Sequence, residues 1–183
     1  MKAKNLRTRR LILRPFKRRD AKKIFVNWAS DDEVAKYMIW NTHRNIAQTK
    51  LFVKKVIKDY KFNPHHWIIT LNENKEVIGS IGVTCIDSQT TKGEIGYCLS
   101  RKYWNKGIMS EALKAVIDYL FNENKFQEIT AKHHIDNIAS GRVMQKCGMS
   151  FVGKSHTYFN KTKQDIIVCD YKISRDGHEF TKK

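Results

Sequence analysis

The sequence predicts an α/β domain in which a mixed, mostly antiparallel sheet is flanked by helices. Two periodicities lead to this prediction: apolar residues recur every three to four positions in some segments, and alternate or run together briefly in others. The third observation is the length, because 183 residues suit one domain with a sizeable core. We therefore expect a single domain over residues 1–183, with the element order βαα(α)βββαβαββ.

The N-terminal third contains one strand and then helices. Arg10–Arg14 alternates and is typical of a strand. Asp20–Ala29 places its large apolar residues on one helical face, and Ser30-Asp-Asp-Glu has the form of a capping box that opens a short helix through Met38. Asn45–Tyr60 keeps helical spacing throughout. This part should therefore be mainly helical.

The middle of the chain changes to strand periodicity, and three consecutive strands with short connections indicate an antiparallel meander. A polar loop, residues 87–92, joins the second of these strands to the third. The remaining strands are expected at His66–Leu71, Glu76–Ile86, Gly93–Leu99, Glu128–His133, Ser150–Tyr158 and Asp165–Ile173, and the remaining helices at Met109–Phe121 and Ala139–Lys146.

The composition excludes some classes of protein and leaves others open. With 35 Lys and Arg against 18 Asp and Glu, the formal net charge is +17. Such a field attracts phosphates in nucleic acid, a ribosome or a cofactor, but it also suits a plain solvated surface. No apolar run approaches the ~20 residues of a membrane helix, and the first residues lack the apolar stretch of a secretory signal. The four cysteines are well separated, so we expect reduced thiols and a cytoplasmic location without membrane association.

The stretch from Glu94 to Leu113 is the most informative, because a strand runs into a polar and aromatic turn just before a strongly amphipathic helix. The first turn of a helix leaves backbone N–H groups without partners, and the helix dipole favours anions there. Gly107 allows a close approach of the backbone to a ligand. Lys106 adds positive charge, and Ser110 can cap the helix or bind a phosphate. These features suit a diphosphate, although one glycine before a helix is also common in ordinary turns.

Several segments together resemble the GNAT acetyltransferases, and within them the RimJ/RimL-type enzymes that acetylate the N-termini of ribosomal proteins. The resemblance spans nearly the whole chain. It is carried by motifs in the family's order, at Thr8–Pro15, Val77–Gly82, Glu94–Tyr97, Tyr103–Leu113 and Asn137–Met149. It implies a GNAT fold, in which splayed strands bind acetyl-CoA, and an acetyl-CoA-dependent N-acetyltransferase.

The resemblance also implies which residues bind the donor. Backbone amides of the loop and first helical turn would hold the diphosphate, and the strand edge would pair with the pantetheine arm as an added strand. The chain departs from the family loop at its first side chain, Trp104, and at its final small residue, Met109. Met109 is expected to narrow the approach without abolishing backbone binding. The implied donor-binding residues are Cys98, Leu99, Trp104, Asn105, Lys106, Gly107, Ile108, Met109, Ser110, Asn137 and Ser140.

Acetyl transfer needs a neutral amine, a base and a donor of a proton or dipole to the leaving thiolate. Glu94 matches the position of the family's catalytic glutamate, and an ordinary salt-bridged Glu at a strand start remains the alternative. Met144 stands where many members carry a tyrosine acid, so Ser140 is the implied substitute, with simple CoA binding as its alternative. Tyr97 and Tyr103 are fallback hydroxyls.

The sequence therefore predicts transfer of an acetyl group to a primary amine, most of all a protein N-terminus of ribosomal type, in a monomer or homodimer. Ribosome association would suit the positive charge. Two alternatives stay open: a small-molecule amine such as a polyamine, aminoglycoside or amino acid, helped by the acidic run Asp31–Glu33, and a non-catalytic module that binds CoA or RNA. No metal site is expected, because adjacent histidines such as His133 and His134 point to opposite faces of a strand.

Overall fold

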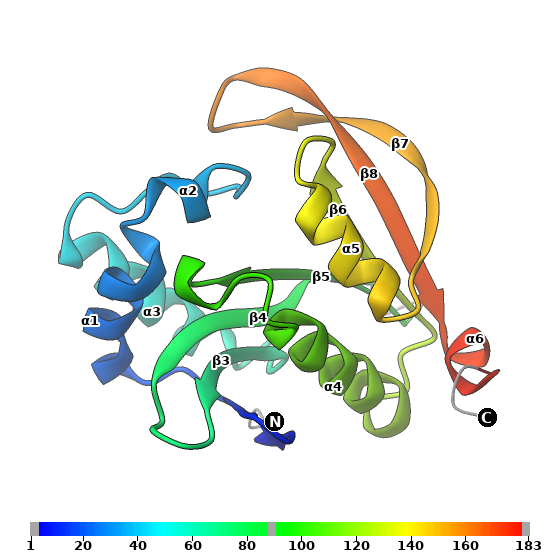
Figure 1. The fold of residues 1–183 in the computed structure, drawn as a ribbon, viewed down its shortest axis with the longest axis horizontal. Coiled ribbons are helices and arrows are strands. Elements are labelled where there is room, and N and C mark those ends of the chain that lie inside the picture. Colours follow the sequence, from blue (N-terminus) through cyan, green and yellow to red (C-terminus); the bar gives the residue numbers. More distant parts are fainter. Residues whose placement is uncertain (1–3, 88–90, 181–183) are drawn as a thin grey trace. The chain divides into compact units, whose positions relative to one another are not determined.

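The structure is a computed structural model that describes residues 4–87 and 91–180. The elements follow the predicted order, with a short strand added at the start and a short helix at the end (Figure 1). The strands are β1 (Leu6–Arg7), β2 (Leu11–Arg14), β3 (His66–Leu71), β4 (Val77–Asp87), β5 (Lys92–Leu99), β6 (Glu128–His134), β7 (Ser150–Phe159) and β8 (Gln164–Ser174). The α-helices are α1 (Ala21–Ile24), α2 (Asp32–Ala35), α3 (Ile46–Asp59), α4 (Ile108–Glu123), α5 (Ile138–Lys146) and α6 (Arg175–Phe180).

The strands form one sheet in the order β1-β2-β3-β4-β5-β6-β8-β7. Strands β5 and β6 pair in parallel. The pairs β1–β2, β2–β3, β3–β4, β6–β8 and β7–β8 are antiparallel. The expected mixed, mostly antiparallel sheet flanked by helices is therefore confirmed. Of the predicted loop between β4 and β5, residues 88–90 lie outside the described residues.

Contacts between residues divide the chain into two compact units, which we treat separately. The N-terminal unit consists of residues 1–82 and 97–108, and the C-terminal unit of residues 83–96 and 109–183. The prediction of a single domain over residues 1–183 stays a prediction.

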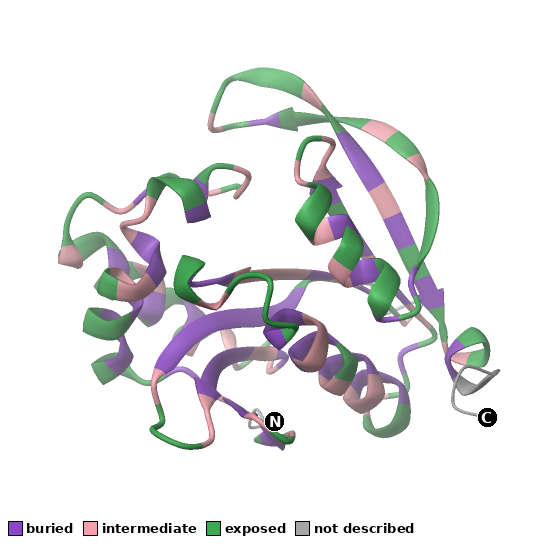
Figure 2. Cartoon of the chain, in the orientation of Figure 1, coloured by how far each residue is buried: buried purple, intermediate pink, exposed green. Residues whose placement is uncertain are grey.

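The N-terminal unit has a core between its helices and its strands. Phe16, Ile24, Trp28, Val53 and Ile68 are buried together there. Figure 2 shows the matching pattern, with β3 and the first part of β4 buried almost throughout. The predicted helix over residues 20–29 is present but broken into three pieces: a 3-10 turn η1 (Arg18–Asp20), then α1, then a π-helical segment η2 (Phe25–Ala29).

The predicted capping box at Ser30 is wrong. The N-cap of α2 is Asp31, whose side chain accepts a hydrogen bond from the Glu33 N–H at 3.0 Å. Ser30 instead closes the preceding π-helical segment, donating its hydroxyl hydrogen to the Phe25 carbonyl at 2.7 Å. The carboxylate of Asp31 is an N-cap as favourable as a serine hydroxyl, so the helix starts one residue later than the motif suggested.

The C-terminal unit is built on the long β7–β8 hairpin and on β6, with α5 packed against this part of the sheet (Figure 1). The helix α5 ends where predicted, because Gly148 adopts the left-handed conformation with φ of 82° that glycine accepts without steric cost. The predicted apolar stripe of α4 is fully buried at Ala112, Leu113, Val116, Ile117, Leu120 and Phe121.

All four cysteines are free thiols, as expected, although Cys85 is exposed. In the part of the chain that the structure describes, no helix combines the length and apolar character needed to cross a membrane.

Candidate functional site

The turn before α4 has an unusual backbone. After a short 3-10 turn, η3 (Arg101–Tyr103), Trp104 is extended with ψ of 155°. Asn105 and Gly107 then both have positive φ, of 59° and 68°. Asparagine and glycine are the residues that adopt the left-handed region most readily. The local sequence therefore specifies this loop, which we call the donor loop (residues 104–107).

The first turn of α4 is anchored by its apolar residues. Ile108 and Met109 are only 4% and 6% exposed, whereas Lys106 and Gly107 are exposed. Met109, expected to narrow the approach to the loop, is therefore packed into buried surroundings. The N–H groups of the first turn have no intrahelical acceptors, so together with the helix dipole they suit an anion.

Arg10, the residue before β2, contacts the donor loop although the two are far apart in the sequence. Its Nη1 donates a hydrogen bond to the Lys106 carbonyl oxygen at 3.0 Å. Its Nη2 lies 3.6 Å from the position that a Cβ on Gly107 would take. Sequence reasoning did not single out Arg10. It belongs to the motif Thr8–Pro15, and nothing in that motif indicates its partner.

Cys98 and Leu99, at the end of β5, present opposite edges. The Cys98 carbonyl faces β4, because it lies 2.5 Å from where a Cβ on Gly79 would be. The next carbonyl, of Leu99, accepts a hydrogen bond from the Trp104 indole at 2.8 Å. The strand edge expected to pair with pantetheine is thus engaged in part by the loop itself, although a carbonyl has a second lone pair to offer.

The Cys98 thiol is an unsuitable nucleophile. Burial raises the pKa of Cys98, with the contact to the Ser80 hydroxyl at 3.4 Å opposing that shift. Burial likewise raises the pKa of Cys147 to about 12. Neither thiol supplies a ready thiolate, so neither is a candidate nucleophile.

Glu94 lies where β5 and β6 stop pairing. Their parallel pairing covers Lys92 to Glu94, and Glu94 is opposite Thr130. The Glu94 side chain is 37% exposed, and its carboxylate is 3.7 Å from the Lys132 ammonium, which also contacts Asp170 at 3.9 Å. Glu94 is therefore a half-exposed, ion-paired carboxylate.

The C-terminal part of the sheet separates Glu94 from α5. The contact with Lys132 places Glu94 on the Lys132 face of β6. His133 points to the other face, where its Nε2 would lie 2.6 Å from a Cβ on Gly141 of α5. The two predicted catalytic residues, Glu94 and Ser140, therefore belong to opposite faces of this part of the sheet.

Asn137 and Ser140 are brought together at the start of α5. Asn137 is the N-cap, and its side-chain oxygen accepts a hydrogen bond from the Ser140 N–H at 3.3 Å. The Asn137 side chain thus caps the N-terminus of α5. Met144, in place of the usual tyrosine, is 1% exposed and offers no hydroxyl.

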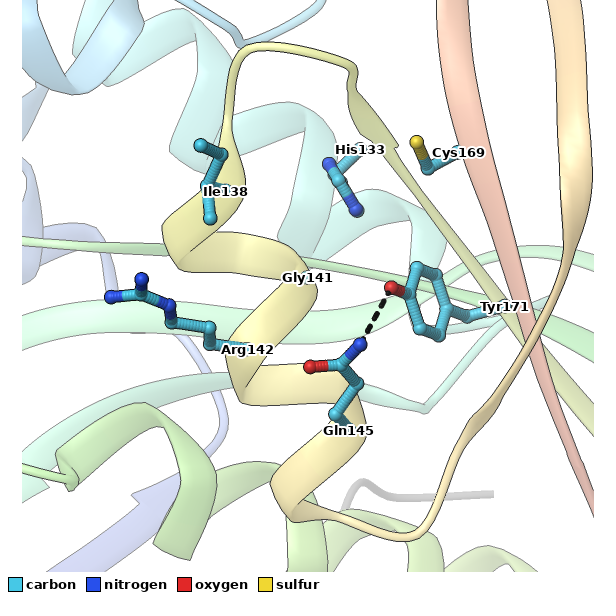
Figure 3. A pocket seen from close by; sticks show the side chains of 7 residues that line it. All are labelled: His133, Ile138, Gly141, Arg142, Gln145, Cys169 and Tyr171. Atoms are coloured by element: carbon cyan, nitrogen blue, oxygen red, sulfur yellow. Dashed lines mark hydrogen bonds between the residues drawn. The ribbon is translucent and has the colours of Figure 1, made fainter.

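A pocket of about 200 Å³ lies between α5 and the strands β6 and β8 (Figure 3). Within it the Gln145 amide donates a hydrogen bond to the Tyr171 hydroxyl at 3.3 Å. The His133 Nδ1 carries a proton, because its partner at 2.8 Å is the His134 carbonyl, which only accepts. The pocket lies on the face of the sheet that α5 covers, which is the face opposite Glu94. It is lined by His133, Ile138, Gly141, Arg142, Gln145, Cys169 and Tyr171.

The fallback hydroxyl of Tyr103 is poorly suited to proton transfer. Desolvation and the neighbouring Glu76 carboxylate raise the pKa of Tyr103 to about 12. Its ring is also flanked by the ammonium groups of Lys102 and Lys106, at 5.5 Å and 5.6 Å from the ring centroid. Tyr103 is therefore a structural residue next to the donor loop.

The acidic run considered for a cationic substrate is largely neutralised. Asp31 forms an ion pair with Arg101 at 3.1 Å, and Asp32 one with Arg44 at 3.1 Å. Within residues 4–87 and 91–180, no three His, Cys, Asp or Glu side chains come together in a way that could hold a metal ion.

A comparison with known protein families identifies the chain. The model of the acetyltransferase (GNAT) domain matches residues 10–150, which include the donor loop, Glu94 and α5. The chain belongs to the GNAT family of acetyltransferases. Enzymes of this family use acetyl-CoA, so acetyl-CoA is the donor substrate of this GNAT enzyme.

Individual relatives agree with the family assignment. An uncharacterised N-acetyltransferase, p20 of Bacillus licheniformis, is 33% identical over 164 residues, covering 88% of this chain and 90% of p20. The crystal structure of a GNAT acetyltransferase from Bacillus anthracis has a TM-score of 0.84 at 26% identity, covering 94% of this chain and 99% of that one. The microcin C7 self-immunity acetyltransferase MccE, solved with acetyl-CoA and AMP, shares the fold with a TM-score of 0.80 at 18% identity, covering 91% and 93%.

Proposed function

We propose that this GNAT enzyme transfers the acetyl group of acetyl-CoA to the N-terminal α-amine of a protein, of the ribosomal type. The donor supplies an activated thioester. In this proposal, backbone N–H groups of the donor loop and of Ile108 to Ser110 hold its diphosphate. The end of β5 at Cys98 and Leu99 receives the pantetheine arm, and Asn137 and Ser140 lie toward its thiol end.

Glu94 is the proposed general base. Its carboxylate takes the proton that the amine loses as the new C–N bond forms, either directly or through a water molecule. The departing thiolate needs a proton or a dipole, and Ser140 in the first turn of α5 is the proposed source. Because Glu94 and Ser140 belong to opposite faces of the sheet, the base would act on the acceptor while Ser140 acts on the donor sulfur.

The observation that carries the choice of acceptor is that neither Glu94 nor α5 offers a strong acid or base. The Glu94 carboxylate is half exposed and shared with Lys132, and Met144 removes the usual phenol. With ordinary pKa values, roughly 10% of α-amines but only about 0.04% of lysine side chains are neutral at pH 7. A site with little power to deprotonate its acceptor therefore favours an N-terminal amine.

A relative of known acceptor supports the same class. The ribosomal-protein-serine acetyltransferase of Escherichia coli K12 is 29% identical over 93 residues, covering 50% of this chain and 52% of that enzyme. The net charge of +17 would favour docking on RNA-rich surfaces such as a ribosome. The ion pairs of Asp31 and Asp32 with arginines count against a cationic small molecule at that place.

The test is acetylation of matched peptides. The reaction is monitored through the free thiol that acetyl-CoA releases on each transfer. One peptide has a free N-terminus and no lysine, a second has a blocked N-terminus and one lysine, and spermidine represents small amines. We expect turnover of the free N-terminus at least about tenfold faster than of the lysine peptide, in line with the difference in neutral amine. Faster acetylation of spermidine or of the blocked peptide would contradict the proposed acceptor.

A further inference from the structure

Arg10 makes a long-range contact that the acetyltransferase chemistry does not by itself require. The contact joins residues 96 positions apart in the sequence, and it ends on the carbonyl of the Lys106–Gly107 peptide at 3.0 Å. Both residues belong to the N-terminal unit. A guanidinium hydrogen bond to a carbonyl is charge-assisted and therefore stronger than one between neutral groups.

The orientation of that peptide decides where its N–H points. A trans peptide is planar, and its C=O and N–H groups point in opposite directions. The Lys106 carbonyl faces Arg10, so the Gly107 N–H faces away from Arg10. Within the N-terminal unit, no described group accepts a hydrogen bond from the Gly107 N–H. This N–H is therefore available to an acceptor from outside the unit, such as a ligand.

The loop needs such an external restraint because its backbone is permissive. Gly107, with φ of 68°, directly follows the Lys106–Gly107 peptide, and Asn105, with φ of 59°, lies one residue before that peptide. Glycine populates positive and negative φ about equally, so neighbouring peptides can rotate at small cost. Arg10 adds a charge-assisted bond that favours one orientation. It also polarises the peptide, which strengthens the donor at the opposite end.

We propose that Arg10 is a positioning residue for the donor: it fixes the Lys106–Gly107 peptide so that the Gly107 N–H is presented to the diphosphate of acetyl-CoA. Arg10 acts through the peptide and not by touching the reacting atoms. The inference rests on the part of the proposed function that places the diphosphate at the donor loop. It does not depend on which amine is the acceptor.

The first measurement is the affinity for CoA by calorimetry, which needs no acceptor. Arg10→Met removes the hydrogen-bond donor of the guanidinium and keeps most of the side-chain length. Arg9→Met is the matched control one residue away. Arg9 is exposed, and its replacement changes the net charge equally. We expect Arg10→Met to weaken CoA binding about tenfold, the size of one hydrogen bond to a charged group, while Arg9→Met stays within about twofold. Arg10→Lys should recover part of the loss.

The second measurement separates a role at the diphosphate from a general structural one. S-acetylpantetheine carries the same thioester but no diphosphate, and its kcat/KM is measured with whichever amine the wild-type enzyme acetylates. We expect Arg10→Met to lower kcat/KM for acetyl-CoA about tenfold and to leave kcat/KM for S-acetylpantetheine at the wild-type value. The melting temperature of each variant is measured as well, to confirm that the variant is folded.

The outcomes are decisive in both directions. Equal CoA affinity of Arg10→Met and Arg9→Met would overturn the inference. An equal loss with acetyl-CoA and S-acetylpantetheine would overturn it as well, since the residue would then support the structure in general. If the wild-type enzyme binds CoA but acetylates no peptide N-terminus, the proposed acceptor fails, and the calorimetric comparison still decides the role of Arg10.

Discussion

The donor loop and the face that carries Glu94 are built from different parts of the polypeptide. The loop offers backbone N–H groups, so the departures from the family pattern at Trp104 and Met109 change the side chains and keep the donors. The proposed acid and base instead depend on the identity of side chains. Glu94 is a single carboxylate, and Met144 on α5 lacks a hydroxyl that no backbone group replaces. A site made of main chain therefore tolerates substitutions that would change a site made of side chains.

The first test lowers the pH and measures the stability of the protein. The unit that holds the donor loop contains three histidines with lowered pKa values, so its stability should depend on pH. Desolvation lowers the pKa of His66 to about 4 and also lowers the pKa of His43 and of His65. Above pH 6.5 His66 is neutral in both the folded and the unfolded state, so its full contribution to folding stability is present. As the pH falls from 6.5 to 4 the unfolded state binds the proton first, and about 3 kcal/mol of stability is lost for His66.

The measurement is the free energy of unfolding in urea at pH 7 and at pH 4.5, for the wild type and for His66→Gln. The wild type should lose more stability between these pH values than the variant, because the variant has nothing to protonate at that position. His156→Gln, at an exposed position of β7, is the control and should behave as the wild type. Equal losses in the wild type and His66→Gln would show that His66 does not carry this dependence.

The second prediction concerns the side-chain site. Replacing Glu94→Gln should lower kcat about a hundredfold, the lower range for loss of a general base, and leave the affinity for acetyl-CoA unchanged. Glu128→Gln is a close control, since Glu128 is also a strand carboxylate paired with a lysine, Lys92, at 3.1 Å. A kcat that is unaffected by Glu94→Gln between pH 6 and pH 9 would remove Glu94 as the base.

Most of the fold could be predicted from the sequence because periodicity reports burial. The helix α4 and the strands β3 to β8 lie within a few residues of their predicted bounds. Most of them bury apolar residues at regular spacing, whereas β7 is exposed over most of its length. The strand β1 has two residues and α6 has six, too few to show a period. The start of α2 was misplaced because Ser30 and Asp31 are equally good N-cap residues by sequence. The preceding π-helical segment decides between them, since it engages the Ser30 hydroxyl.

The candidate site was predictable only where its parts are close in the sequence. Gly107 before an amphipathic helix is a local signal, and so is the cap of α5 by Asn137. The contacts of Glu94 with Lys132 and of Arg10 with Lys106 depend on the order and register of strands. Sequence patterns that describe one element at a time carry no information on such pairs.

The last prediction tests whether the donor loop depends on its backbone conformation. Gly107→Val should weaken CoA binding about tenfold, because a β-branched residue at φ of 68° pays roughly 1–2 kcal/mol or forces the peptide to rotate. Calorimetry with CoA measures the loss, and kcat at saturating acetyl-CoA should change little. Gly153→Val in β7 is the control, since a Cβ there meets nothing within 4 Å. If Gly107→Val bound CoA as tightly as Gly153→Val, the loop would not need its left-handed glycine, and the contrast between a main-chain site and a side-chain site would lose its physical basis.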